Sequence, residues 1–506
     1  MTTETNSGPG HAGAVADEAA PRTARTGTSE TGSDLSTGLK NRHLTMISIA
    51  GVIGAGLFVG SATAIADAGP AVLLSYLAAG TLVVLVMRML GEMATANPDT
   101  GSFSTYADRA LGRWAGFSVG WLYWWFWVLV IPWESIVAGR VAHGFFPGVP
   151  EWAFAAGILV VLVATNLASV KNYGEFEFWF ALVKAAAIAV FIVVGVLAIA
   201  GVLPGNGASG LRQLTAEGFA PNGWSAVITA IAITMFSFMG TEIVTIAATE
   251  SKDPVQGIHR ATNSVIWRIG TFYLASIFIV VSLVPHSVFA SGKGAGGHEI
   301  GTYGEALTAM GLAPDTAYTI VNIIVLTAVS SCLNSALYTA SRMAFSLAVR
   351  GDAPTSWARV SGSKVPSRAV LASSAVAVAC LVLHYGFSDT GLFDFLLLTS
   401  GGVALVIYLV IALSQLVERR RSDSAGHRPP VRMWLYPGLT WATIAFIVVV
   451  MAVMAFGPSR LELYWTLALA AVTVTAGVVV QRRHRGELGR LDEREAARTG
   501  AGRGGH

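Results

Sequence analysis

Charged residues are scarce in this sequence of 506 residues. Asp, Glu, Lys and Arg together make up 12% of the chain, about half of what a soluble protein of this size normally carries. Hydrophobic residues make up 53%, and the mean hydropathy is +0.60. This composition argues against an ordinary soluble protein and predicts a chain that is dissolved in lipid.

Cysteine is scarce too, and several nucleotide and metal motifs are missing. Cys332 and Cys380 both lie in apolar runs, so we expect neither a disulfide framework nor a cysteine metal site. The sequence has no P-loop, no HExxH motif and no cluster with metal-ligand spacing, which argues against ATP-driven chemistry and a bound metal. The basic runs 419–421 and 482–485 suit the anionic inner leaflet, and no nucleic-acid partner is expected.

The two ends of the chain differ from its middle. Residues 1–38 are rich in Gly, Ala, Ser and Thr, have no apolar periodicity and predict a disordered tail. No apolar core of a signal peptide is expected before the first long apolar stretch. Residues 482–506 form a second polar tail, which leaves one membrane domain over 39–481.

Twelve apolar segments of that domain are long enough to cross a membrane. They lie near 44–66, 71–95, 115–139, 152–170, 176–201, 223–249, 264–284, 316–347, 369–386, 391–415, 433–456 and 462–481. The alternation of apolar and polar residues that marks a transmembrane barrel is missing. The predicted fold class is therefore an all-α integral membrane protein, built as a bundle of twelve helices.

The distribution of Lys and Arg between these segments predicts the orientation. With a cytoplasmic N-terminus, the inward loops hold Arg109, Arg113, Lys171, Lys252, Arg260, Arg268, Arg342, Arg350, Arg359, Lys364, Arg368, Arg419, Arg420, Arg421, Arg428 and Arg432. The outward loops hold Arg140, Arg212, Lys293 and Arg460. The positive-inside rule then places both termini in the cytoplasm of a multi-pass cell-membrane protein.

The stretch "IAGVIGAGLFVG" at 49–60 places four glycines in one apolar segment. Each glycine inside a helix costs up to ~1 kcal/mol relative to alanine. Gly54-Ala55-Gly56 falls near the middle of the bilayer, where it serves either close packing of helices or a helix break that lines a cavity. This segment alone does not distinguish the two interpretations.

A second segment, "ITMFSFMGTEIVTIAATE" at 233–250, favours the break. It carries Gly240 and the intramembrane Glu242, and it lies five segments after the first. Paired glycine-interrupted helices in corresponding positions are typical of transporter binding sites.

The two breaks together predict a receptor for a small zwitterion. The amides of Ala55, Gly56 and Leu57 would hold a carboxylate at the positive end of a half-helix. Carbonyl groups near Phe236 and Ser237 would suit an ammonium group.

Several motifs occur in an order typical of one family. They are "GVIGAGLFVG" (51–60), "AGPA" (68–71), "GEM" (91–93), "PDTGSFSTYADRALGRWAGF" (98–117), "FSFMGTEIVTIAATES" (236–251) and "SCLNSALYTASRM" (331–343). Over residues 39–485 the sequence resembles bacterial amino-acid permeases of the amino acid–polyamine–organocation superfamily. Within it, "GWLYWWFWVLVIPWE" (120–134), "SVKNYGEFEFWFALVK" (169–184) and "RMWLYP" (432–437) look most like permeases for 4-aminobutyrate (GABA).

The resemblance implies a LeuT-type fold. Residues 44–201 and 223–415 would be inverted five-helix repeats with broken first and sixth helices, and 433–481 would be two peripheral helices. It also implies import of GABA and related ω-amino acids by proton symport with alternating access. The protein would then be a transporter and no enzyme, with the proton as coupling ion, no cofactor, and an amino acid and the lipid bilayer as partners.

Lys184 is the predicted proton-coupling residue. It lies eight residues past Phe176, about 12 Å along a helix, and a charge at that depth is a functional hypothesis by default. The alternative is a lysine that snorkels to the membrane surface. The resemblance implies a fifth-span lysine beside the broken first helix, where its ammonium replaces a coupling cation.

The candidate substrate-binding residues adjoin the two breaks or lie on facing helices. They are Ile53, Gly54, Ala55, Gly56, Leu57, Glu134, Phe236, Ser237, Gly240, Glu242 and Ser331. Glu242 would gate the pathway, hold an ammonium group or form a structural pair, and Glu134 would contact the amine or belong to the outer gate. Ser331, Asn334 and Ser335 share one helix face, and Arg88 and Glu92 are expected to form an ion pair.

Other functions remain open from the sequence. They are a permease for aromatic, branched or basic amino acids, an exchanger, a transporter that uses sodium through Ser330 and Ser331, and a transport-inactive amino-acid sensor. A membrane enzyme would need a convergent nucleophile, base or metal set, and none is found. The sequence sets no oligomeric state.

Overall fold

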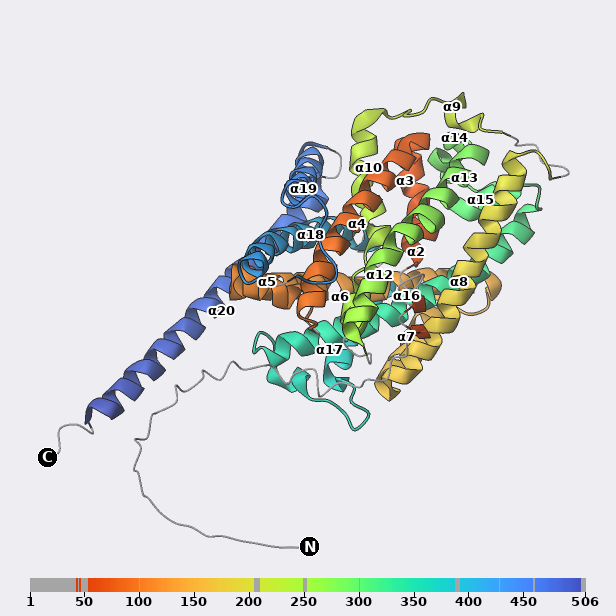
Figure 1. The fold of residues 1–506 in the computed structure, drawn as a ribbon. Coiled ribbons are helices and arrows are strands. Elements are labelled where there is room, and N and C mark those ends of the chain that lie inside the picture. The colour runs from red at the N-terminus through yellow and green to blue at the C-terminus, as the bar shows by residue number, and fades with distance from the viewer. Residues whose placement is uncertain are drawn as a thin grey trace, which may run out of the picture.

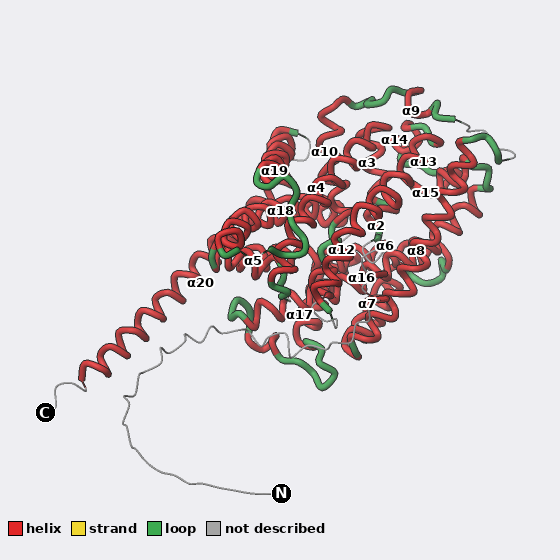
Figure 2. Tube along the Cα trace, viewed as in Figure 1, coloured by secondary structure: helices red, strands yellow, loops and turns green. Residues whose placement is uncertain are grey.

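A computed structural model describes residues 42–43, 45–46, 53–99, 101–203, 210–248, 253–299, 301–386, 392–426, 428–457 and 460–501. The predicted tail over 1–38 lies outside these residues, as do 502–506 of the second tail. Helices dominate the described chain, and in that part the pairing of extended residues is limited to one isolated bridge between Lys293 and Glu299. Figure 2 shows helices joined by short loops.

The main helices follow one another along the chain. They are α2 (Ala55–Phe58), α3 (Gly60–Ala68), α4 (Val72–Ala96), α5 (Phe103–Leu111), α6 (Arg113–Phe145), α7 (Glu151–Ala168), α8 (Val170–Ile199), α9 (Gln213–Ala216), α10 (Gly223–Phe238), α11 (Ile243–Ala247), α12 (Pro254–Arg268), α13 (Ser276–Leu283), α14 (His286–Ser291), α15 (Thr302–Ala309), α16 (Pro314–Val349), α17 (Ser367–Gly386), α18 (Leu392–Ser424), α19 (Gly438–Phe456) and α20 (Arg460–Ala501). A π-helical stretch, Ile269–Ala275, joins α12 to α13.

Eleven segments of the described chain are long and apolar enough to cross a membrane. The first, Ala55–Ala96, has 42 residues, and at 1.5 Å per residue it would be about twice as long as the hydrocarbon core is thick. It covers most of the first expected span and all of the second, and a 3₁₀ turn at Gly69–Ala71 interrupts it. The all-helical membrane fold is therefore confirmed, whereas the count of twelve stays a prediction.

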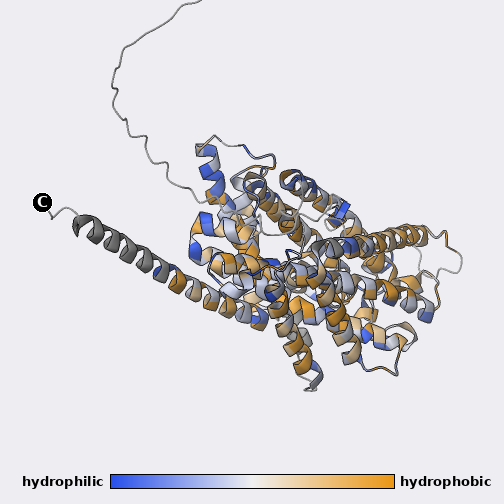
Figure 3. Cartoon of the chain, turned by 90° about the horizontal axis from the view of Figure 1, so that it is seen from below, coloured by the Kyte–Doolittle hydropathy of each residue, from blue (hydrophilic) through white to orange (hydrophobic). Residues whose placement is uncertain are grey.

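The helices differ in how deeply they are buried. In the most apolar stretch of 18 residues within Gly223–Ala247, 89% of the residues are buried, and in that of α6 83% are buried. In the corresponding stretch of Arg460–Arg482 only 17% of the residues are buried. Figure 1 shows α6 and α16 crossing inside the bundle, while α20 projects from its side. Figure 3 shows hydrophobic residues, in orange, recurring along the helices among paler ones, as expected for helices in a membrane.

Both glycine-rich segments interrupt their helices. The chain is helical at 45–46, and α2 begins only after Gly54, whose backbone is extended with φ −129° and ψ −153°. Further along, α10 ends at Phe238 and α11 begins at Ile243. Gly240 lies between them with φ 99°, a conformation that side chains with a Cβ rarely adopt.

Two arginines that the sequence analysis assigned to loops lie inside the bundle. Arg268 ends α12 and Arg342 belongs to α16, and their exposed fractions are 3% and 1%. Arg268 lies near the start of the expected segment 264–284 and Arg342 near the end of 316–347, where the bounds of a segment are hard to place from sequence. The predicted bias of positive charge survives without them, and the orientation stays a prediction.

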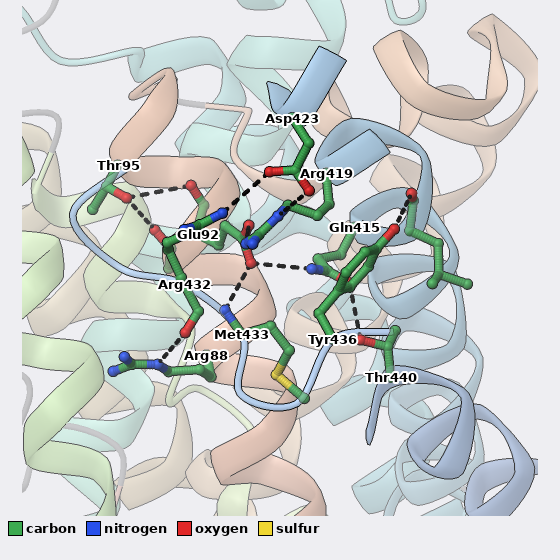
Figure 4. Close-up of polar contacts among 12 residues, drawn as sticks. Arg88, Glu92, Thr95, Gln415, Arg419, Asp423, Arg432, Met433, Tyr436 and Thr440 are labelled. Carbon is green, nitrogen blue, oxygen red and sulfur yellow. Dashed lines mark hydrogen bonds and ion pairs between the residues drawn. The ribbon is translucent and has the colours of Figure 1, made fainter. Parts of the chain in front are cut away.

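The expected ion pair between Arg88 and Glu92 is wrong. Glu92 forms its ion pair with Arg419 of α18, and Figure 4 shows that Glu92 also accepts hydrogen bonds from Gln415 Nε2 (3.0 Å) and from the amide of Met433 (2.8 Å). Arg88 donates instead to the carbonyl of Arg432, at 2.8 Å. The spacing of residues within one helix does not reveal these partners, because they lie more than 300 positions away in the sequence.

This cluster leads to a prediction on stability. We expect Arg419→Ala to lower the free energy of unfolding by about 3 kcal/mol, since it leaves the Glu92 carboxylate buried without its cation. Arg421→Ala is the matched control, because Arg421 is 56% exposed and pairs with Glu418 at the surface. Thermal unfolding of the detergent-purified variants tests this. Equal melting temperatures for both variants would show that the Glu92 pair does not stabilise the fold.

Candidate functional site

A small cavity lies where the two helix interruptions meet. Its lining residues come from α2 and the residue before it, from α10 and the residue after it, and from α6 and α16: Gly54, Gly56, Phe126, Trp127, Val130, Glu134, Phe236, Ser237, Met239 and Cys332. The cavity has a volume of about 10 Å³, which is room for about one water molecule. In this conformation the site is therefore closed, and a larger ligand requires its walls to move apart.

Gly56 sits directly against α10. The hydroxyl of Ser237 donates a hydrogen bond to the carbonyl of Gly56 at 2.8 Å. A Cβ at Gly56 would come within 3.0 Å of Ser237 Cα and 3.1 Å of Phe236 Cδ1. Gly54-Ala55-Gly56 therefore serves both purposes considered from the sequence. The helix break lines a cavity, and Gly56 permits close packing of α2 against α10.

Glu134 occupies the anion position that the first break offers. The Ala55 amide donates to both carboxylate oxygens of Glu134, at 3.2 and 3.3 Å, and Glu134 is 1% exposed. The sequence analysis expected the Ala55 amide to be open to a substrate carboxylate, whereas here it binds a carboxylate of the chain itself. Leu57 N also has a partner, the carbonyl of Gly54 at 3.3 Å.

Aromatic side chains surround Phe236, the aromatic residue expected over the substrate. The Phe236 ring meets Trp133 nearly edge to face, with centroids 5.9 Å apart, and Phe126 at 6.3 Å. Rigid, interlocked rings of this kind restrict the shape of a ligand pocket. Phe236 lines the cavity, whereas Trp133 supports it from α6.

Glu242 lies at the second break but does not line the cavity. Both of its carboxylate oxygens accept from the amide of Gly240, at 3.1 Å each. The neighbouring Thr241 hydroxyl accepts a 2.5 Å hydrogen bond from Arg268. Arg268 thus brings a buried cation to this break, and the sequence analysis missed it because it assigned Arg268 to a loop.

Lys184 lies against the first break from the side of α8. Its ammonium nitrogen donates to the carbonyl of Ile53 at 2.9 Å and to the hydroxyl of Ser331 at 2.8 Å. The side chain is 0% exposed and starts fourteen residues into α8, about 21 Å along the axis. At that depth, and with both partners inside the bundle, the ammonium group does not snorkel.

A second buried acid on α8, Glu177, joins the same network. The Ser331 hydroxyl donates to Glu177 Oε1 at 2.6 Å, and Glu177 is 0% exposed. The sequence analysis missed this residue, although its spacing of seven from Lys184 places both on one helix face. Ser330 stays out of the network, because its hydroxyl donates to Leu326 of its own helix at 2.6 Å.

Polar residues on α16 continue this network towards α7. Asn166 of α7 donates to the side-chain oxygen of Asn334 at 2.8 Å, and Ser335 lies 3.4 Å from the hydroxyl of Tyr173. Figure 1 places α7, α8 and α16 together on one side of the bundle. Polar groups from three helices therefore converge on the inward face of α8.

Comparison with known proteins gives one family. The sequence profile of the family described as "Amino acid permease" matches residues 43–484. A "Probable GABA permease" of Pseudomonas aeruginosa is 57% identical over 89% of this chain and 93% of its own length. A "Gamma-aminobutyric acid permease" of Escherichia coli is 52% identical over 89% and 95%. An "Aromatic amino acid transport protein AroP" of Corynebacterium glutamicum is 42% identical over 85% and 92%.

Proposed function

The chain belongs to the amino acid permease family, which makes it a membrane transporter and no enzyme, and from that premise we propose that it imports GABA by proton symport. The names of the relatives at 57% and 52% identity support the substrate. Import would proceed by alternating access in the cell membrane, with both termini in the cytoplasm. The family membership agrees with the resemblance seen in the sequence.

We propose further that the fold is the LeuT type with twelve spans. Ala55–Ala96 would then hold most of the first span and the whole second span, on either side of the turn at Gly69–Ala71. Two observations support this: the interruptions before α2 and after α10 lie in corresponding segments, and the Ser237–Gly56 hydrogen bond joins them. Crossed half-helices at the bundle centre are the usual binding site of such transporters.

The single observation that carries the substrate proposal is the carboxylate at Ala55. Glu134 binds the break as a carboxyl group, through the backbone amide of Ala55, and helix N-termini bind anions in the same way. On substrate entry the carboxylate of GABA would displace Glu134 from this amide. The freed Glu134, still lining the cavity, would then be available to the ammonium group at the other end of the substrate.

Lys184 would supply the coupling site for the proton. Its ammonium holds the carbonyl of Ile53 next to the break, so its protonation state and the geometry of the anion position are linked. A buried charge with partners on two other segments is the arrangement expected of a proton site in a membrane transporter.

Uptake by the purified protein in liposomes tests this function. With an inward proton gradient, we expect labelled GABA to accumulate saturably and other ω-amino acids to compete with it, because one carboxylate and one ammonium group satisfy the site. The controls are empty liposomes and liposomes whose gradient a protonophore has dissipated. Accumulation of an aromatic or basic amino acid without GABA would refute the substrate, and GABA uptake indifferent to the proton gradient would refute the coupling.

A further inference from the structure

One hydroxyl group bridges two buried charged side chains on α8. Ser331 Oγ accepts from the Lys184 ammonium at 2.8 Å and donates to Glu177 Oε1 at 2.6 Å. All three side chains are 0% exposed, and no direct ion pair of Lys184 with Glu177 exists within 4 Å among the described residues. The hydroxyl is therefore the hydrogen-bonded link between the two.

We propose that Ser331 and Glu177 relay the proton of Lys184 towards the end of α8 that adjoins α7. This inference rests on the proton symport proposed above and names the path by which the proton leaves. In the relay, one N–H bond of Lys184 breaks and its proton passes to Ser331 Oγ. At the same time the O–H bond of Ser331 breaks and that proton passes to Glu177 Oε1.

The relay conserves charge inside the bundle. An ammonium and a carboxylate become a neutral amine and a neutral carboxylic acid, while Ser331 ends as it began, as a hydroxyl. The net charge of the three side chains is zero before and after the transfer. No isolated charge is therefore left in a medium of low dielectric, where an isolated charge is most costly. Both hydrogen bonds lie in the distance range that proton transfer needs.

The second carboxylate oxygen of Glu177, Oε2, can pass the proton on to a further acceptor. Three buried atoms here have no hydrogen-bond partner within the described chain: Glu177 Oε2, Asn334 Nδ2 and Asn166 Oδ1. They offer one donor and two acceptors for hydrogen bonds. Asn166 and Asn334 are held together at 2.8 Å, so the set is built by two helices that face α8.

The helix positions give the relay its direction. Lys184 is about 21 Å from the start of α8, and Glu177 is about 10 Å from it, by helical rise. Beyond Glu177, the rings of Tyr173 and Tyr338 stack with centroids 4.1 Å apart, and the Arg342 guanidinium lies 4.0 Å over the Tyr338 ring. The titratable groups around Lys184 are Glu177 on α8, Cys332 on α16 and Glu134 on α6, and Tyr173, Tyr338 and Arg342 follow beyond Glu177.

Two separate readouts in proteoliposomes test the relay. GABA counterflow measures binding and alternating access without a proton gradient, and a pH dye inside the vesicles measures the proton flux that GABA drives. For Glu177→Gln we expect counterflow within about twofold of the wild type but at least a tenfold loss of GABA-driven proton flux, and Ser331→Ala should lose that flux to the same extent. Ser331→Thr restores the hydroxyl and should restore the flux.

Glu175→Gln is the matched control for Glu177→Gln. It makes the same chemical change two residues away on α8, where Glu175 is 32% exposed and pairs with Arg42, and it should keep the wild-type flux. A wild-type ratio of protons to GABA in Glu177→Gln would overturn the relay. Loss of counterflow together with proton flux in Glu177→Gln would overturn it too, by showing a structural role. A wild type without any GABA-driven proton flux would instead refute the proposed symport itself.

Discussion

Lys184→Ala is expected to abolish the accumulation of GABA against its gradient, while binding and exchange survive in part. The ammonium of Lys184 holds the Ile53 carbonyl at 2.9 Å, two residues before the amide that would bind the substrate carboxylate. A cation and an anion that bind so close together strengthen each other, and by linkage the effect is equal in both directions. Removing the amine would remove the proposed proton site and should leave transport that only runs downhill.

Lys184→Arg should not rescue accumulation, because a guanidinium group stays protonated at any relevant pH. The measurement is GABA uptake under an inward proton gradient, with equal amounts of reconstituted protein. Lys293→Ala is the control, since Lys293 lies in an exposed loop before α15 and its loss should change nothing. Full accumulation by Lys184→Ala would take this residue out of the mechanism, and Glu242 would become the leading candidate for the proton site.

Features that depend on local sequence were predictable. Long apolar segments identify the membrane helices because hydrocarbon leaves the backbone few alternatives. The glycines at 54, 56 and 240 lie at or next to interrupted helices. The interruptions were predictable because a glycine at that depth of a membrane helix indicates either close packing or a break. Lys184 was identifiable for a similar reason, since a charge in the middle of a span needs a purpose.

Features that depend on contacts between distant segments were not predictable in this way. Spacing within a helix paired Glu92 with Arg88, whereas its cation is Arg419 of α18. The sequence analysis expected Glu134 at the substrate amine or in the outer gate, but only the fold shows that it reaches the Ala55 amide, 79 residues away.

Glu177 and Arg268 mark a second kind of failure. Both lie close to the ends of apolar runs, where a sequence reading expects a charged side chain to reach water. The bundle surrounds them instead, and neither is more than 3% exposed. Burial of a charge near a span end depends on the neighbouring helices, which hydropathy along one segment does not describe.

Gly56→Leu is expected to insert in the membrane and to lose GABA binding. Even a Cβ at this position comes within 3.0 Å of the Ser237 backbone, and a leucine would push α2 away from α10 and break the Ser237–Gly56 hydrogen bond. Overpacking of this kind costs about 1–3 kcal/mol, so Gly56→Ala alone should weaken binding by about 5- to 150-fold. The longer leucine would also fill the cavity, whose walls must separate for a ligand to enter.

Gly60→Ala separates this effect from a general loss of glycine flexibility. Gly60 lies four residues further along, at the start of α3, and a Cβ there has no atom within 4 Å. It makes the same chemical change without touching α10, so its GABA affinity should match that of the wild type. Scintillation proximity binding of labelled GABA to purified protein compares the three variants directly. Wild-type affinity in Gly56→Leu would mean that the substrate binds away from the first break, and the glycines would then serve helix packing alone.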